Sequence, residues 1–317
     1  MRGNHIRFRC FVKDTTPTGL TVPFNQGTYL SSGATDDNNT LALAAVASQR
    51  YHLIACPWDS SDPTNIGRVV AFMGSQADPL TGRRGRMVCG TQASLGTATT
   101  FAQGLNAERA QVLWHFNAQN TPAELAASAV GEMAEGLSTD RATNFDGRVL
   151  GGIAPQWSKA DQPEGTEIVA ALNVGLTPVG VEGNNATIIR SITSRSRDAL
   201  SNPDYRVLDT HYVDVSDYIA DILQDGFPDR FSGFKLGTDI AGEMPPPGVA
   251  TAGTVKSWAI EVIGKQNNIL LENFDTNTVP NMVFERNETA KGRVDAVIPI
   301  DIIELFHQFA ADVRQVN

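Results

Sequence analysis

Short apolar runs alternate with amphipathic segments over the first two thirds of the chain. Each apolar run has the length and composition of a buried strand, and each intervening segment spaces its apolar residues as a helix does. The runs predict strands over 51–56, 86–89, 111–116 and 148–153, after an earlier strand over 3–12, and the segments predict helices over 40–47, 62–73, 98–105, 123–135 and 164–174. Strands that are apolar throughout, each followed by a helix, indicate an α/β fold with a mainly parallel sheet covered by helices on both faces.

Two of these helices have strong start signals. Asp62 followed by Pro63 can cap and begin one helix. Thr121, followed by Pro122 and Glu124, supplies a cap, a proline at the first helical position and an acidic first turn for another. Gly175 is placed to end the helix over 164–174.

The stretch 177–193 predicts two short strands around a tight turn. Valines alternate over 179–181, and β-branched residues dominate 187–192. The residues between them, Glu-Gly-Asn-Asn at 182–185, tolerate the positive φ that a hairpin turn needs. The chain after this hairpin has a different, acidic composition, so we expect two domains, 1–195 and 196–317.

The elements after residue 198 come in a different order, which predicts a smaller α+β domain. The sequence predicts strands over 211–215, 282–286 and 293–298, helices over 216–226, 255–270 and 301–313, and a loop over 242–253. The last helix has a capping pair, with Asp301 at the N-cap and Glu304 three residues later. Its expected apolar stripe consists of Ile302, Phe306, Phe309 and Val313.

Charge is distributed unevenly between the two predicted domains. The formal net charge is −10, which argues against non-specific binding to nucleic acid or to an anionic membrane. Up to Arg195 there are 15 Lys and Arg against 16 Asp and Glu, whereas from Ser196 onward there are 10 against 19. The second part therefore favours a basic partner.

Cysteine usage and hydropathy indicate the kind of compartment in which the chain folds. Of the three cysteines, Cys56 and Cys89 lie in apolar runs and are expected to be buried free thiols, which suggests folding in a reducing compartment. Cys10 adds no metal-knuckle spacing. No apolar run approaches the length of a membrane span, and the N-terminus has no secretory h-region.

Two charge features stand out as candidate contact sites. The glycine-rich stretch 81–86 carries Arg83, Arg84 and Arg86 and is either a solvated loop or a contact for an acidic neighbour. Over 198–229 there are eight aspartates against one basic residue, and Asp217, Asp221 and Asp225 are spaced i, i+4, i+8 on one predicted helix. Like charges at that spacing cost a helix ~0.2–0.5 kcal/mol per pair, so this stripe is either a solvated face or a surface for a basic partner.

Motifs of catalysis are missing from the sequence. It contains no G-x-S-x-G, H-E-x-x-H, Walker A or G-x-G-x-x-G pattern. His115 near the end of a predicted strand and Asp59 after another are the best catalytic candidates, with a structural histidine and a turn or capping aspartate as the alternatives. No serine lies in a recognisable nucleophile turn to complete a triad with them, so we expect no enzyme.

Several motifs, in order along the chain, resemble those of contractile tail sheath proteins of Mu-like and P2-like phages. They are Gly3-Asn4-His5-Ile6, Arg190-Ser191-Ile192-Thr193, the segment 212–219 (YVDVSDYI), Phe234-Lys235-Leu236 and the segment 292–299 (GRVDAVIP). In the family an N-terminal arm precedes the first of these motifs. The resemblance therefore predicts that this chain is truncated at its N-terminus and forms a monomer or small oligomer rather than tubes.

The resemblance implies a structural machine protein. Sheath subunits form stacked hexameric rings around an inner tail tube, and contraction drives that tube through the host envelope. The family's core is a subtilisin-like α/β domain without catalytic residues, and its terminal arms add strands to the sheets of neighbouring subunits.

The implied partners are further copies of this chain, the tail tube protein, the baseplate and the tail terminator. No nucleic acid, small-molecule substrate, cofactor or metal is implied, and the expected location is the virion tail after assembly in the host cytoplasm. The residues expected at subunit or tube contacts are Arg83, Arg84, Arg86, Asp217, Asp221, Asp225, Glu304, Gln308, Arg314 and Gln315. Alternatives are a type VI secretion-like sheath subunit, an α/β hydrolase and a monomeric ligand-binding module.

Overall fold

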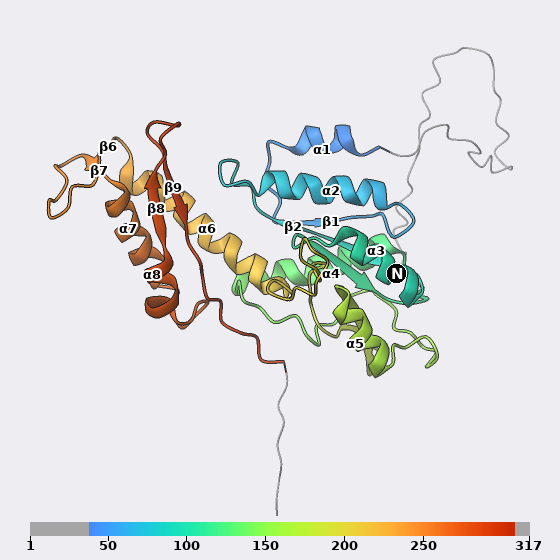
Figure 1. The fold of residues 1–317 in the computed structure, drawn as a ribbon. Coiled ribbons are helices and arrows are strands. Elements are labelled where there is room, and N and C mark those ends of the chain that lie inside the picture. The colour runs from blue at the N-terminus through green and yellow to red at the C-terminus, as the bar shows by residue number, and fades with distance from the viewer. Residues whose placement is uncertain (1–37, 308–317) are drawn as a thin grey trace, which may run out of the picture. The chain divides into compact units, whose positions relative to one another are not determined.

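Five strands form the main sheet, in the order β1-β2-β3-β4-β5 (Figure 1). The computed structural model describes residues 38–307. The strands are β1 (Leu53–Ala55), β2 (Arg86–Thr91), β3 (Ala110–Trp114), β4 (Leu176–Glu182) and β5 (Asn185–Ile188). The first four pair in parallel, and β5 pairs antiparallel with β4. The predicted α/β fold with a mainly parallel sheet is confirmed.

Helices cover both faces of this sheet. They are α1 (Thr40–Val46), α2 (Pro63–Gln76), α3 (Leu95–Leu105), α4 (Pro122–Thr139) and α5 (Gly165–Asn173). Successive strand residues point to opposite faces, so Val112 packs in the core under α2, α3 and α5, whereas Leu113 packs in the core under α4. Both cores are fully buried, which explains why the strands read as continuous apolar runs.

The predicted helix starts are confirmed. The Asp62 carboxylate accepts a hydrogen bond from the Asn65 amide at 3.0 Å, and Pro63 begins α2. At α4 the Thr121 hydroxyl and the Glu124 carboxylate form a reciprocal capping box. These local contacts fix where each helix enters the fold.

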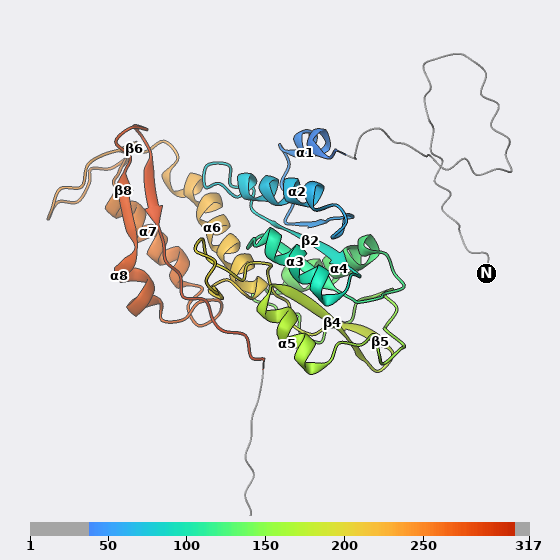
Figure 2. The same cartoon turned by 45° about the vertical axis from the view of Figure 1, so that its right-hand side comes forward.

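The predicted hairpin at 177–193 is confirmed as β4 and β5, seen most clearly in Figure 2. The prediction that 148–153 forms a strand of the parallel sheet is wrong. Its first residues instead pair antiparallel with the outer edge of β5, where the Leu150 amide donates to the Ala186 carbonyl at 2.8 Å. Gly147 and Gly152 both have positive φ, so the segment bends away at each end, while Leu150 still enters the core.

The C-terminal region, residues 196–307, is built around one long helix. Its elements are α6 (Thr210–Phe231), β6 (Lys235–Leu236), β7 (Val249–Ala250), α7 (Ala252–Gly264), the π-helical turn η1 (Phe274–Thr278), α8 (Val279–Asn281), β8 (Val283–Arg286) and β9 (Val294–Val297). Figure 1 shows α6 running from the main sheet to the helices and strands of this region. One core of its own, which includes Val215, Ile219, Ile263 and Ile302, holds the region together.

One prediction for this region is wrong in type, and another is right in type but differs in its bounds. The strand predicted over 211–215 is the first turn of α6. Residues of α6 are buried on two sides, by the main sheet and by the C-terminal core, so buried positions recur at every second residue and imitate a strand. The helix predicted over 255–270 begins at Ala252 and ends at Gly264, and Asn268 just beyond it has a positive φ.

The helix predicted over 301–313 is also wrong for residues 301–307, the part that the structure describes. Residues 301–307 are extended, and Ile302 pairs with Leu271. The Asp301 carboxylate accepts hydrogen bonds from Asn273 and Asn277 instead of capping a helix. Phe306, assigned to the apolar stripe, is 77% exposed. Residues 308–313, like the strand predicted over 3–12 and Cys10, lie outside the described residues.

Candidate functional site: an arginine–aspartate seam

The stretch 81–86, here called the arginine loop, lies directly against α6. Gly82 has φ +66°, and a Cβ atom at that position would lie 2.2 Å from the Gln224 side chain on α6. The Arg84 guanidinium donates to the Gln224 carbonyl oxygen at 3.0 Å. Glycine is therefore favoured at position 82 by the backbone conformation, and a side chain there would have to displace the flexible end of Gln224.

Four arginines of the sheet region meet three aspartates of α6. Arg109 forms two hydrogen bonds of 2.8 Å with Asp217. Arg50 lies 2.6 Å and Arg84 3.5 Å from Asp221. The members of this arginine–aspartate seam are Arg50, Arg84, Arg86 and Arg109 on one side and Asp214, Asp217 and Asp221 on the other. Two of the three residues of the acidic stripe, Asp217 and Asp221, thus have basic partners within their own chain.

Arg86 is the buried centre of the seam. Its side chain is 1% exposed and binds both carboxylate oxygens of Asp214, with the shortest distance 2.9 Å. It also donates to the Gln111 carbonyl oxygen at 2.7 Å, and the Gln111 amide continues to Thr177 and Ser191. A buried charge needs such a set of partners, because each unpaired group would cost several kcal/mol of desolvation.

The second pair of the seam, Arg109 and Asp217, is also largely buried. Burial raises the pKa of Asp217 above its ordinary value, against the stabilising hydrogen bonds from Arg109, and the carboxylates of Asp214 and Asp221 act in the same direction as burial. The arginines thus lie among three carboxylates of one helix face, and Arg109 opposes the effect of burial at Asp217. The repulsion expected from the i, i+4 spacing is offset inside the chain.

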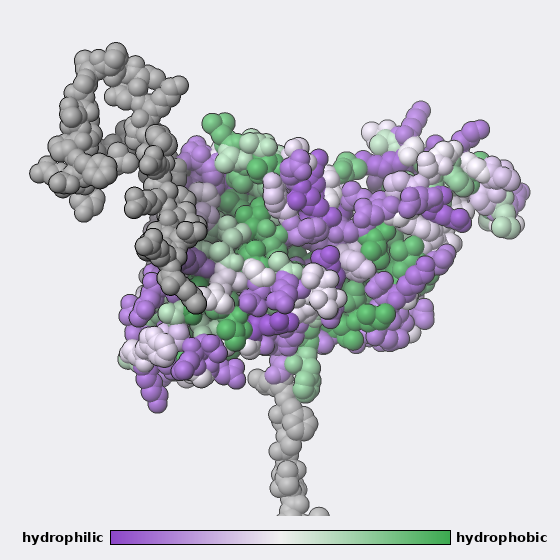
Figure 3. Space-filling model, turned by 180° about the vertical axis from the view of Figure 1, so that it is seen from behind, coloured by the Kyte–Doolittle hydropathy of each residue, from purple (hydrophilic) through white to green (hydrophobic). Residues whose placement is uncertain are grey.

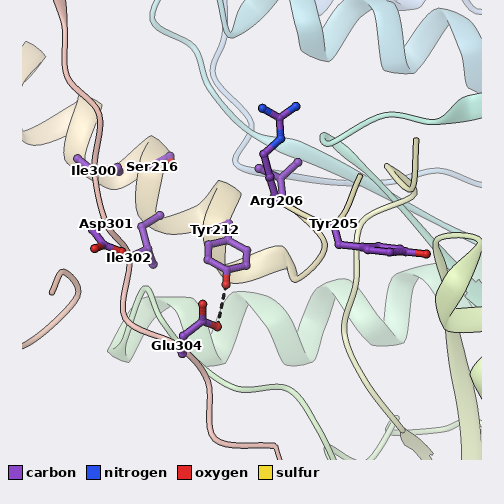
Figure 4. A pocket seen from close by; sticks show the side chains of 9 residues that line it. Tyr205, Arg206, Tyr212, Ser216, Ile300, Asp301, Ile302 and Glu304 are labelled. Carbon is purple, nitrogen blue, oxygen red and sulfur yellow. Dashed lines mark hydrogen bonds between the residues drawn. The ribbon is translucent and has the colours of Figure 1, made fainter. Parts of the chain in front are cut away.

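A groove of about 610 Å³ lies between α6, the loop 205–207 and the extended segment 300–304 (Figure 4). Figure 4 shows Tyr212 on α6 pointing at Glu304, to which its hydroxyl donates at 2.8 Å. At the other end Arg206 binds Asp204, and hydrogen bonds from Arg206 and Arg195 hold the pKa of Asp204 well below its ordinary value. The charged side chains of the groove are thus paired within the chain.

Comparison with known proteins finds similar folds. No family model matches the sequence, and no curated protein matches it. The sheath tail protein from Desulfitobacterium hafniense is similar, with a TM-score of 0.57 and 16% identity over 83% of this chain. A chain of the anti-feeding prophage baseplate gives a TM-score of 0.55 and 10% identity over 88% of this chain and 74% of its own length.

This chain has the fold of contractile tail sheath proteins. The resemblance stated from the sequence motifs is confirmed at the level of fold. The chain spans 59% of the length of the Desulfitobacterium hafniense sheath protein.

Within this sheath fold, the residues expected at subunit or tube contacts fall into four groups. Four of them form ion pairs in the seam, namely Arg84, Arg86, Asp217 and Asp221. Asp225 is exposed, and the side chains of Arg83 and Asp225 make no hydrogen bond or ion pair among the described residues. Glu304 is exposed and accepts from Tyr212. Gln308, Arg314 and Gln315 lie outside the described residues, and a contact of any of the ten with a neighbour stays a prediction.

The sequence reasoning missed Arg50, Arg109 and Asp214 as members of the seam. Arg109 stands alone before a strand and Arg50 before another, so neither belongs to a charge cluster. The sequence left two possibilities for the arginine loop and for the acidic stripe, a solvated surface or a contact with a partner outside the chain. The complementary signs of these two clusters are the signal that could have paired them, since a like-charged helix face gains most from arginines close by.

The catalytic candidates Asp59 and His115 make no hydrogen bond with each other. Asp59 accepts hydrogen bonds from the amide and hydroxyl of Ser61, as a turn aspartate does. His115 is completely buried, and burial lowers its pKa to about 4. Across residues 38–307, no group of three or more His, Cys, Asp or Glu is placed to hold a metal ion, and no helix has the length and hydropathy to cross a membrane.

Proposed function

We propose that this chain is the structural subunit of a contractile phage tail sheath, which polymerises around an inner tail tube and contracts to drive that tube through the host envelope. The observation that carries the proposal is the sheath fold itself, which extends over 83% of the chain in the match to the Desulfitobacterium hafniense protein. The sheath motifs of the sequence, such as 212–219 and 292–299, support it independently.

The finer features belong to the same proposal. The main sheet with its covering helices corresponds to a subtilisin-like domain without catalytic function over 1–195, and 196–317 forms the smaller C-terminal domain. The subunit assembles with copies of itself as stacked hexameric rings, and its further partners are the tail tube protein, the baseplate and the tail terminator. It acts in the virion tail after assembly in the host cytoplasm.

A contractile injection system is the related candidate. The similarity to a chain of the anti-feeding prophage baseplate favours this wider class, because that chain has the same fold. A type VI-like sheath falls in the same class. In each case the chain has a structural role, and we expect no hydrolytic turnover of peptide or ester substrates by this protein.

The charges that the seam leaves free are the proposed assembly contacts. Asp225 follows Asp221 by four residues on α6 and is exposed, and Arg83 precedes Arg84 on the arginine loop and is partly exposed. A neighbouring subunit that contacts this surface can therefore form ion pairs with one positive charge, on Arg83, and one negative charge, on Asp225. Glu304, exposed beside the groove, is the proposed contact nearest to the tube.

Electron microscopy of assembly tests the proposal. The protein is expressed together with its tail tube protein, and the product is imaged. We expect tubes coated with stacked rings of this subunit, and we expect Asp225→Arg to leave the subunit folded, by circular dichroism, while coating is reduced. Folded subunit that leaves the tail tubes bare would overturn the proposed function.

A further inference from the structure

Four aromatic side chains of the C-terminal region gather where the end of α6 meets α7. Phe231 lies at their centre, with its ring centroid 5.2 Å from that of Phe227, 5.8 Å from that of Phe234 and 5.5 Å from that of Trp258. The last two contacts are edge to face, a favoured arrangement of aromatic rings. Phe227 and Phe234 are nevertheless 45% and 44% exposed. These four residues, here called the aromatic patch, therefore offer ring surface to another molecule.

Two positive charges flank the aromatic patch. Arg230 lies three residues after Phe227 on α6, which places the two side chains on the same helix face. Lys235 directly follows Phe234. Both cations are exposed, and within residues 38–307 neither side chain makes a hydrogen bond or an ion pair. They are therefore available to an acidic partner.

The carboxylates nearest to the patch in sequence do not face it or are already paired. Asp225 and Asp229 each lie two residues from Phe227, which is about 200° around an α-helix and so on the side turned away from the ring. On α7, Glu261 is paired with Lys265 at 3.8 Å. The surface thus combines exposed rings with two free positive charges.

The loop 237–248, here called the proline loop, has the complementary composition. It joins β6 to β7 and contains three consecutive prolines at 245–247, two acidic residues, Asp239 and Glu243, and no basic residue. Pairing of β6 with β7 holds its two ends together, and Figures 1 and 2 show it projecting away from α6 and α7. Met244 is 93% and Ile240 60% exposed. The proline loop is therefore an apolar and acidic tip that its own chain leaves uncovered.

The conformation of the proline loop suits binding to aromatic rings. Residues 243–246 form no helix or strand. Proline fixes φ near −65°, and consecutive prolines favour the polyproline II conformation. Aromatic surfaces bind such segments well, because a preformed conformation loses little entropy on binding. Glu243, next to the prolines, makes no side-chain hydrogen bond or ion pair in the described part of the chain.

We propose that the proline loop of one copy of this chain binds the aromatic patch of a second copy. The prolines and Met244 pack on the rings, and Glu243 lies close to Arg230 and Lys235. The two surfaces differ, so the contact can repeat from one copy to the next, as the subunits of a ring or filament require. The inference rests on the proposed function for its occupant, because a sheath brings many copies together, and it names a surface by which they recognise one another.

Fluorescence anisotropy of a labelled peptide with the sequence of 238–248 tests recognition by the whole chain. We expect saturable binding, weakened about tenfold or more by Phe227→Ala, since exposed aromatic anchors carry much of the affinity of an interface. Phe306→Ala is the matched control, because Phe306 is a 77% exposed phenylalanine outside the patch, and it should bind as the natural protein does. Thermal unfolding checks that each variant is folded. No binding, or equal binding by Phe227→Ala, would overturn the proposal.

A charge exchange tests the orientation of the loop on the patch. Arg230→Glu should weaken binding of the natural peptide, and it should bind a peptide that carries Glu243→Lys more tightly than the natural one. The natural protein should show the opposite preference. If both proteins prefer the same peptide, Glu243 does not lie close to Arg230 and the proposed contact is wrong.

Cross-linking between copies tests the occupant. One sample of the whole chain carries Ala241→Cys in the proline loop and another carries Ser232→Cys beside the patch, both at exposed positions that leave the rings intact. After mixing, a short bis-maleimide should join the two chains, whereas Val169→Cys, 58% exposed on α5, should not be joined to Ala241→Cys. Peptide binding without this cross-link would assign the patch to a different proline-rich partner and overturn the proposal. Coated tail tubes without the cross-link would do the same while the proposed function stands, and a cross-link with bare tubes would support the contact against that function.

Discussion

The central strands of the main sheet and the β8–β9 hairpin of the C-terminal region differ most in what covers them. Every residue of β2 and β3 is buried, because helices pack on both faces of the sheet. In the hairpin no residue is fully buried, and Val283 and Val297 are 46% and 66% exposed. One region therefore completes its own core, and the other presents apolar strand residues to the outside.

This difference bears on how each region is stabilised. A two-stranded hairpin is at best marginally stable in water unless another layer packs on it. Here α7 lies along one side of β8, and Figure 3 shows hydrophobic patches on the surface of the C-terminal region as well as on the sheet region. Large exposed apolar patches are rare on monomeric proteins, and where they occur they often mark contact surfaces. The C-terminal region is accordingly the part that we expect an assembly to complete.

The largest predicted effect concerns the tie between the two regions. Arg86→Leu removes the buried cation and leaves the Asp214 carboxylate without its partner. Breaking one side of a buried ion pair costs about 3–5 kcal/mol, so the free energy of unfolding in urea should fall by that amount. Arg83→Leu, on the same loop but without a side-chain hydrogen bond or ion pair in the described chain, is the control and should change it by less than about 0.5 kcal/mol. Equal effects would mean that the seam does not hold the regions together.

A pair of truncations compares the two regions directly. Leu113→Ala opens a cavity under α4 and should cost about 2–5 kcal/mol. Val297→Ala on the exposed hairpin should cost less than about 0.5 kcal/mol in the free subunit, because the side chain is already largely in water. Urea unfolding of both variants measures this. A large loss for Val297→Ala would show that the hairpin is covered after all.

Acid should act on the sheet region through His115. Both of its ring nitrogens are buried without a hydrogen-bond partner among residues 38–307, and burial lowers its pKa to about 4. Because the unfolded chain binds this proton near pH 6.5 and the folded chain does not, stability is complete above about pH 6.5 and falls as the pH drops toward 4, by roughly 3 kcal/mol in total. His115→Leu should flatten the unfolding free energy over that range. An unchanged pH profile would contradict this role of the histidine.

The smallest effect is expected at the outer end of the seam. Asp221→Asn removes a carboxylate that Arg50 and Arg84 share at a partly exposed position. Such pairs contribute about 0.2–1 kcal/mol and are screened by salt, so the loss should shrink between low and high ionic strength. Melting temperatures across a salt series measure it. A loss that is large and independent of salt would place Asp221 with the buried part of the seam.

The sheet region was predictable because its signals are local. Periodic apolar runs, the Asp62 and Thr121 caps and the turn at 182–185 all act within a few residues of one another. The exception, 148–153, failed because its pairing with β5 depends on residues that lie far away along the chain. Apolar character alone showed that this segment is buried, but not in which direction it pairs.

The C-terminal region and the site depended on contacts that the sequence does not display locally. The start of α6 resembled a strand because two different regions bury it, and the capping pair at Asp301 and Glu304 looked complete although both side chains bind elsewhere. The two charge clusters were recognised, yet their pairing with each other required the helix to pass the arginine loop. Long-range pairing of this kind is a property of the fold rather than of any segment.

Hydrogen exchange in free and assembled protein tests most directly whether assembly completes the C-terminal region. Peptides covering 86–91 in the main sheet serve as the internal reference, since they are buried in the single chain. We predict that they exchange slowly in both states, and that peptides covering 283–297 exchange fast in the free subunit and become protected once the subunit coats its tail tube. Fast exchange of 283–297 in both states, or protection already present in the free subunit, would contradict the account.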